Sequence, residues 1–126
     1  MPKYAAATTR CAAGTVAGMD DEWPPPEARV QAAVWDAERS LERGEYLAAT
    51  SRLADVFGIA GEQEELVCGL HHLGAAGYRA RAGEGHRALR QLDKARRRLA
   101  PFPDVSGLVE VVAGDIESAG GELAEP

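Results

Sequence analysis

The sequence has little of what several protein classes require. It contains two cysteines, Cys11 and Cys68, and two widely separated thiols do not make the disulfide framework of a small secreted domain. No stretch approaches the roughly 20 consecutive apolar residues of a membrane-spanning helix. Arg10 interrupts the run of small residues near the start, so no export signal is indicated. We therefore expect a cytoplasmic protein that does not contact a membrane.

Aromatic residues make up 6% of the chain, and β-branched residues do not form the alternating runs that strands require. Alanine and leucine are plentiful and favour helix. A chain of 126 residues is long enough for one hydrophobic core and short for two. We expect an all-α fold in one domain at residues 23–120, with a flexible extension at 1–22 and a frayed tail at 121–126.

Apolar residues repeat every three or four positions in five segments, as they do along one face of a helix. In chain order the expected helices span Glu27 to Arg43, Glu45 to Phe57, about Glu62 to Ala82, the segment between Gly85 and Pro101, and Val105 or Ser106 to about Ala119. Apolar side chains occupy several faces of the third helix, and its interior glycines, Gly69, Gly74 and Gly77, indicate close approach by neighbours. We expect this helix to be central in a compact bundle.

An internal repeat supports a construction from helical hairpins. Gly44-Glu45 and Gly83-Glu84 are each followed by alanine and then leucine at the same spacing. The second copy, with Pro101 beyond it, resembles the second helix of a tetratricopeptide unit. Two units are fewer than the three or more that a solenoid usually needs, so the repeat predicts a compact bundle.

The combined pattern resembles a known family over about residues 23 to 115. Its segments are "PPPE", "ERGEYLAA", "CGLHHLGAAGYRARAGE" and "ALRQLDKARRRLAPFPD", and together they are similar to DUF309, a family of uncharacterised prokaryotic proteins. The resemblance implies an all-helical fold. It also implies a His-x-x-x-Glu-x-x-Trp pattern on the second helix, which has been suggested to bind a metal.

This sequence departs from the family pattern at the residues that would bind the metal. Thr50 stands in place of the histidine, Ala54 in place of the glutamate and Phe57 in place of the tryptophan. A hydroxyl and a methyl group cannot replace an imidazole and a carboxylate as metal ligands. Helical spacing predicts that Thr50 and Ala54 lie on the inward flank of the face formed by Tyr46, Leu53 and Phe57. The resemblance therefore implies that this chain has lost the site.

A different metal site is an alternative hypothesis. Cys68 and His72 are four residues apart on the third helix, so a thiolate and an imidazole would lie on one face. Further ligands would come from the neighbouring His71 and from a carboxylate, for which the candidates are Asp55, Glu64 and Glu65. The competing interpretation is a buried cysteine beside a hydrogen-bonded histidine.

The fourth helix carries a basic face. Arg87, Arg90, Lys94 and Arg97 lie opposite the apolar stripe of Ala88, Leu92, Ala95 and Leu99. Such a face could bind phosphate or nucleic acid, whereas the competing interpretation is a solvated face paired with carboxylates of neighbouring helices. The formal net charge of −6 and the pI near 5.0 argue against a general nucleic-acid binder.

The leading hypothesis is a non-catalytic helical scaffold or protein-interaction domain. A protein partner fits this interpretation, and we expect no cofactor. The two alternatives are a metal-binding protein or small metal-dependent enzyme with its site near Cys68 and His72, and a phosphate or nucleic-acid binder that uses the basic fourth helix.

Overall fold

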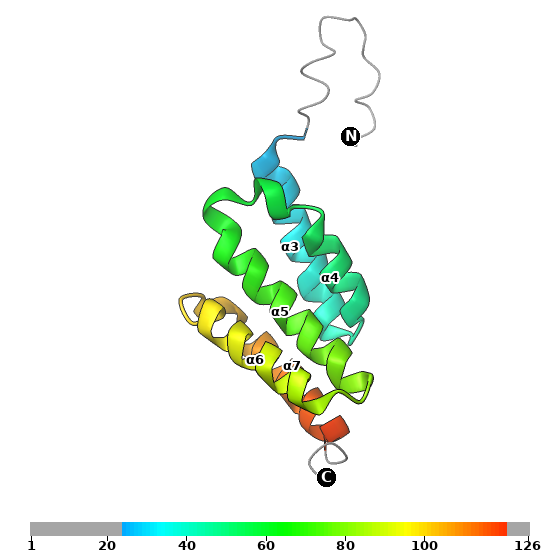
Figure 1. Cartoon of the computed structure of the whole chain (residues 1–126). Helices are drawn as coiled ribbons and strands as arrows, with labels where there is room; N and C mark the ends of the chain where they lie inside the picture. The colour runs from blue at the N-terminus through cyan, green and yellow to red at the C-terminus, as the bar shows by residue number, and fades with distance from the viewer. Residues whose placement is uncertain (1–23, 121–126) are drawn as a thin grey trace, which may run out of the picture.

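Helix dominates the computed structural model, which describes residues 24–120 (Figure 1). The α-helices are α3 (Pro26–Glu42), α4 (Tyr46–Ala54), α5 (Glu64–Arg81), α6 (Gly85–Leu99) and α7 (Ser106–Gly120), and the 3-10 helices are η2 (Phe57–Ile59), η3 (Gly61–Gln63) and η4 (Pro103–Val105). Residues 24–120 contain no strand and five α-helices, so the prediction of an all-α fold with about five helices is confirmed. The expected extension at 1–22 and tail at 121–126 lie outside the described residues.

The first helix begins as its sequence predicts. Pro26 is its first residue, where a helix leaves the backbone N–H without an intrahelical partner, and Glu27 complements the positive end of the helix dipole. The Arg29 side chain donates from Nε to the carbonyl oxygen of Pro24 at 3.1 Å. None of the described helices has both the length and the apolar character to cross a membrane.

The two helical hairpins, α3–α4 and α5–α6, share one turn geometry. Gly44 has a φ of 77° and Gly83 a φ of 82°, in the left-handed region that glycine adopts without a steric penalty. In each turn the N–H of the following glutamate donates to a carbonyl oxygen of the preceding helix, Ser40 in the first turn and Arg79 in the second, at 2.8 and 2.9 Å. The sequence repeat is therefore a repeat of hairpin geometry.

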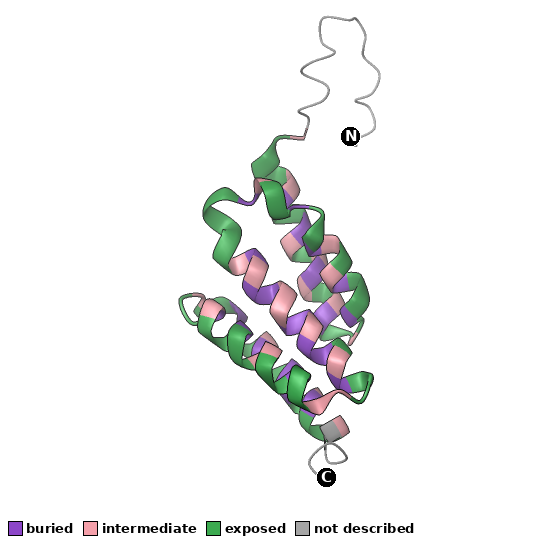
Figure 2. Cartoon of the chain, viewed as in Figure 1, coloured by how far each residue is buried: buried purple, intermediate pink, exposed green. Residues whose placement is uncertain are grey.

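The third predicted helix, α5, is central as expected. It packs against α3, α4, α6 and α7, and Figure 1 shows it between the α3–α4 hairpin and the α6–α7 pair. Buried residues occur on several of its faces: Val67, Gly69, Leu70, Leu73, Gly74, Ala76, Gly77 and Ala80. Exposed positions of the bundle lie mostly on the outer sides of the other helices (Figure 2).

The interior glycines of α5 mark the places where other helices approach closely. A Cβ atom added at Gly77 would lie 2.5 Å from the ring of Tyr46, and one at Gly69 would lie 2.5 Å from the side chain of Leu99. A Cβ at Gly74 would lie 2.8 Å from the methyl group of Thr50. The prediction of close helix approach at these glycines is confirmed.

The last helix closes the bundle. α7 packs against α5 and α6 and also against α3, so the first and last described helices touch. Its buried residues Val109, Val112 and Ile116 belong to the same core as Leu41, Leu53 and Leu70. An open stack of hairpins would keep the first and last helices apart, so the prediction of a compact bundle is confirmed.

The second helix ends earlier than predicted. α4 stops at Ala54, Val56 has non-helical dihedral angles, and Phe57 begins η2 with 45% of its surface exposed. Val56, which is 2% exposed, packs in the core there. The prediction that Phe57 completes the buried face with Tyr46 and Leu53 is wrong, because the chain leaves the helical register before it reaches Phe57.

Candidate functional site

The residues at the family-pattern positions do not gather into a site. Thr50 is half-buried, and its hydroxyl donates to the carbonyl oxygen of Leu47 at 2.9 Å. Ala54 is exposed. Four residues turn a helix by about 40° beyond one full turn, so a position on the edge of the buried face at Thr50 becomes a solvent position at Ala54. The expectation of an inward position holds for Thr50 and is wrong for Ala54.

Cys68 and His72 are both half-buried on α5. The Nδ1 atom of His72 lies 2.7 Å from Oε1 of Gln91 on α6, within hydrogen-bond distance. The neighbouring His71 packs edge-on against Phe57, with 5.0 Å between ring centroids. Burial, and secondarily the charge of His72, lower the pKa of His71 below its ordinary value. Each histidine thus contacts a neighbour other than Cys68.

The candidate carboxylates do not complete a metal site with this pair. Within residues 24–120 no three His, Cys, Asp or Glu side chains lie close enough together to hold a metal ion. Asp55 lies 3.9 Å from Arg52, and Glu65 lies 3.3 Å from Arg98. Cys68 and His72 supply two ligands, so a metal site there stays a prediction that the described residues do not strengthen.

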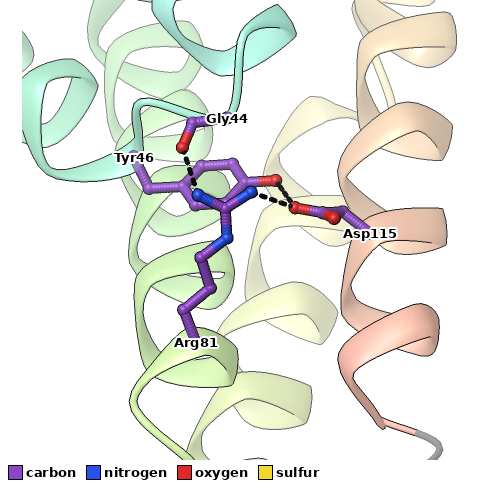
Figure 3. A network of polar contacts seen from close by, with 4 residues as sticks. All are labelled: Gly44, Tyr46, Arg81 and Asp115. Carbon is purple, nitrogen blue, oxygen red and sulfur yellow. Dashed lines mark hydrogen bonds and ion pairs between the residues drawn. The ribbon is translucent and has the colours of Figure 1, made fainter.

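A polar network joins the first hairpin turn to the ends of α5 and α7 (Figure 3). The hydroxyl of Tyr46 donates to Oδ2 of Asp115 at 2.5 Å. Arg81 donates from Nη2 to the same oxygen at 2.9 Å and from Nη1 to the carbonyl oxygen of Gly44 at 2.8 Å. The guanidinium group also lies over the Tyr46 ring, 4.7 Å from its centroid, in a cation–π contact.

The electrostatics of this network favour a structural role. Burial and the hydrogen bond to Asp115 raise the pKa of the Tyr46 phenol above its ordinary value, so the phenol keeps its proton near neutral pH. The carboxylate of Asp115 accepts from both Tyr46 and Arg81, and its charge is balanced by the guanidinium. The network therefore joins α4, α5 and α7 through one oxygen, Oδ2 of Asp115.

Sequence reasoning missed this network. Helical spacing places Tyr46 on the buried face of the second predicted helix, where the structure has it, whereas it assigns no role to Arg81 and Asp115, which lie far apart in the chain. Gly77 was the available signal, since a glycine in the middle of a central helix indicates a large side chain packed against it. That side chain is the ring of Tyr46.

Two shallow surface hollows flank Arg81. One, of about 330 Å³, is lined by Leu47, Tyr78 and the turn at Gly44. The other, of about 390 Å³, is lined by Val111 and Asp115 on α7 and by residues of the same turn. Leu47 is 62% exposed and Tyr78 is 43% exposed, so two large side chains with apolar surface face solvent beside the network.

The four residues of the α6 basic face, Arg87, Arg90, Lys94 and Arg97, are all exposed. Arg97 pairs with Asp93 of its own helix, and Arg87 lies 4.0 Å from Glu84 in the preceding turn. Across the described residues, no ion pair includes Arg90 or Lys94. Exposed positions accordingly dominate α6 in Figure 2.

Other arginines of α6 do pair with neighbouring helices. Arg96 lies 2.9 Å from Glu110 on α7, and Arg98 lies 3.3 Å from Glu65 on α5. The competing interpretation of a solvated face therefore holds in part: the four residues are exposed, as it assumes, while the pairs with neighbouring helices form at the flanks of α6 and not at these four residues.

Comparisons of the chain with models of known protein families, with curated proteins and with solved structures give no match. The resemblance to DUF309 stays a prediction that depends on the order and lengths of the sequence segments. The functional proposal is therefore based on the exposed residues of the bundle.

Proposed function

We propose that this chain is a non-catalytic helical scaffold that binds another protein in the cytoplasm, and that it is a divergent relative of DUF309. The observation that supports binding most is the pair of exposed apolar side chains, Leu47 and Tyr78, that line a hollow beside the polar network. Exposed apolar side chains that gather at a hollow are typical of interaction sites.

The network would favour binding by fixing the shape of this surface. Leu47 follows Tyr46 in α4, and Tyr78 lies one turn before Arg81 in α5. Because Tyr46 and Arg81 are held by Asp115, the helices that carry Leu47 and Tyr78 are already in position. A partner that binds a preformed surface loses less conformational entropy on association.

A non-catalytic role is supported by the way the polar groups of this region are used. The phenol of Tyr46 and the guanidinium of Arg81 both donate to the carboxylate of Asp115, and the guanidinium also lies over the Tyr46 ring. A general base or nucleophile needs a lone pair directed at a substrate, whereas the protonated phenol and Oδ2 of Asp115 are engaged in contacts between helices.

Site-directed photo-crosslinking in cells tests the proposal. A photoreactive amino acid at Leu47 or at Tyr78 is expected to capture the same protein, which then binds the purified chain saturably. Glu62 is a suitable control position, because it is exposed and lies beyond the opposite end of α5 from Arg81. Failure of both positions to capture a protein beyond the level seen at Glu62 would contradict the proposal.

A phosphate or nucleic-acid ligand is the second candidate, favoured by the exposure of the α6 basic face. Its test is direct titration of the purified chain with inorganic phosphate and with a single-stranded RNA oligonucleotide. Binding that falls steeply as salt rises would support this candidate. The absence of binding at low salt would remove it.

A further inference from the structure

Positive charge is concentrated on α6. α6 contains six of the 14 lysines and arginines, with Asp93 as its single carboxylate, while the whole chain has a formal net charge of −6. Arg87, Arg90, Lys94 and Arg97 follow one another at steps of three, four and three residues, which keeps them on one side of the helix. At 1.5 Å per residue the row is about 15 Å long.

The basic face is held in place by the rest of α6. Ala88, Ala95 and Leu99 are buried on the opposite side of the helix and anchor it to the core. Arg96 and Arg98 bind Glu110 and Glu65, which fixes the two flanks. The four exposed cations therefore project from a fixed helix, and Arg90 and Lys94 have no carboxylate partner among the described residues.

We infer that the α6 basic face binds an acidic segment of a partner protein, an inference that rests on the proposed protein-binding function. An acidic helix with carboxylates at positions i, i+3, i+7 and i+10 has the same spacing as Arg87, Arg90, Lys94 and Arg97. Two helices packed side by side lie 8–10 Å apart, a separation that long arginine and glutamate side chains span. The carboxylates at i+3 and i+7 would then meet Arg90 and Lys94, while those at i and i+10 would compete with Glu84 and Asp93 for Arg87 and Arg97.

The composition of α6 favours a polypeptide over a nucleic acid. Proteins that bind single-stranded nucleic acid combine basic side chains with aromatic rings on which bases stack, and α6 contains no Phe, Tyr or Trp. A long polyanion would also extend over the acidic remainder of the molecule, which would repel it. A short acidic segment contacts the basic face alone.

α6 also lacks the exposed apolar face of a membrane-binding helix. A helix that lies in a membrane interface buries a broad apolar face among the lipids. The apolar face of α6 already packs in the core, and Leu89 is its single exposed large apolar residue. The favoured ligand is therefore an acidic polypeptide.

Fluorescence anisotropy with the full chain and a labelled helical peptide tests the inference. The peptide carries glutamate at i, i+3, i+7 and i+10, and a matched peptide carries glutamine there. The glutamate peptide is expected to bind in low salt and to lose affinity between about 0.1 and 1 M salt. Over this range the Debye screening length falls from about 10 to about 3 Å. The glutamine peptide is expected not to bind.

Paired variants place the binding on α6. The double variant Arg90→Gln, Lys94→Gln is expected to weaken binding about tenfold, since each exposed ion pair contributes up to about 1 kcal/mol. The matched control Arg39→Gln, Arg43→Gln removes the same charge from exposed positions of α3 and at its end, and it should change affinity less than about twofold. Circular dichroism and thermal unfolding confirm that each variant is folded.

Three results would overturn the inference: equal binding of the two peptides, equal weakening by the two double variants, or tighter binding of a single-stranded RNA or of vesicles containing phosphatidylserine than of the glutamate peptide. The crosslinking experiment at Leu47 and Tyr78 separates this inference from the proposed function. If crosslinking still captures a partner while the peptide does not bind, the inference of an acidic segment on α6 is wrong and the proposed protein-binding function stands. If crosslinking fails as well, the protein-binding function is also contradicted.

Discussion

At the scale of single residues, Tyr46 connects more elements than any other side chain of the network. Its ring packs against Gly77 of α5 and under the guanidinium of Arg81, and its hydroxyl reaches Asp115 of α7. One side chain thus contributes apolar burial, a cation–π contact and a hydrogen bond to a carboxylate. Its contributions are separable by substitution.

Tyr46→Phe keeps the ring and removes the hydroxyl. We expect the free energy of unfolding to fall by about 1–2 kcal/mol, because a hydrogen bond to a charged carboxylate is lost while Arg81 still pairs with Asp115. Denaturant unfolding near neutral pH measures this. Tyr78→Phe is the matched control, since Tyr78 is 43% exposed, and it should change stability by less than about 0.5 kcal/mol. Equal effects of the two substitutions would contradict the assigned role of the hydroxyl.

The stabilisation by the Tyr46 phenol is expected to depend on pH. Burial, together with the bond to Asp115, raises the pKa of Tyr46 in the folded chain above its ordinary value, so the unfolded chain releases this proton first as pH rises. The stabilisation is therefore complete below the ordinary tyrosine pKa of about 10 and is lost progressively above it. The stability difference between the wild-type chain and Tyr46→Phe should stay constant up to about pH 9.5 and shrink between about pH 10 and 11. A difference that stays constant over this range would refute the proposed linkage.

The two turn glycines predict unequal costs for the same substitution. Gly83→Ala places a Cβ in open space and should lower stability by about 1–2 kcal/mol, the cost of a left-handed backbone for alanine. Gly44→Ala has the same backbone cost, and its Cβ would also lie 2.7 Å from Nη2 of Arg81. Arg81 would have to move away from Asp115, so we expect a larger loss at Gly44. Unfolding free energies of the two variants test this ranking.

At the scale of elements, α5 shows how glycines let helices pack closely. Gly77→Ala would place a methyl group within 2.6 Å of a ring that Asp115 holds in place, and we expect a loss of about 1–3 kcal/mol from overpacking. Gly114→Ala on α7 is the control: nothing lies within 4 Å of its added Cβ, and better helix propensity should stabilise it by about 0.5–1 kcal/mol. Opposite signs in urea unfolding are the expected result. Stabilisation by both substitutions would contradict close packing at Gly77.

The helices were predictable from the sequence where the end of an apolar repeat coincides with a glycine or a proline that begins or ends a helix. Pro26 and Gly44 bracket α3, and Gly83 and Pro101 bracket α6, where both signals coincide. The end of α4 was mispredicted because Phe57 continues the helical spacing while the backbone has already turned into η2. Periodicity shows which residues are apolar, and it does not show where tertiary contacts end a helix.

At the scale of the whole molecule, the contact between α7 and α3 makes one core out of two similar hairpins. We therefore expect a single cooperative unfolding transition. Fluorescence of a Trp23→Phe variant reports on Trp35 in α3, and circular dichroism reports on all helices, so the two urea curves should coincide. Val112→Ala, which removes two methyl groups at a fully buried position of α7, should lower the free energy of unfolding by about 2 kcal/mol and shift the two urea midpoints equally. Separate transitions would indicate independently stable hairpins.

The long-range features of the candidate site were the hardest to predict. The basic face of α6 follows from helical spacing alone, because its four residues belong to one element. The network of Tyr46, Arg81 and Asp115 depends on how three helices are placed relative to one another, which local patterns do not encode. The expected loss of a site at Thr50 and Ala54 depends on the family resemblance and stays a prediction.

The central claim is that this bundle recognises another protein through surfaces that its core holds in place. The most direct test is the dissociation constant of the partner captured by crosslinking, measured with the wild-type chain and with two variants. A Leu47→Ser, Tyr78→Ser variant should weaken binding at least about tenfold while thermal unfolding stays near that of the wild-type chain, because both side chains are largely exposed. An unchanged dissociation constant in this variant and in Arg90→Gln, Lys94→Gln would contradict the claim.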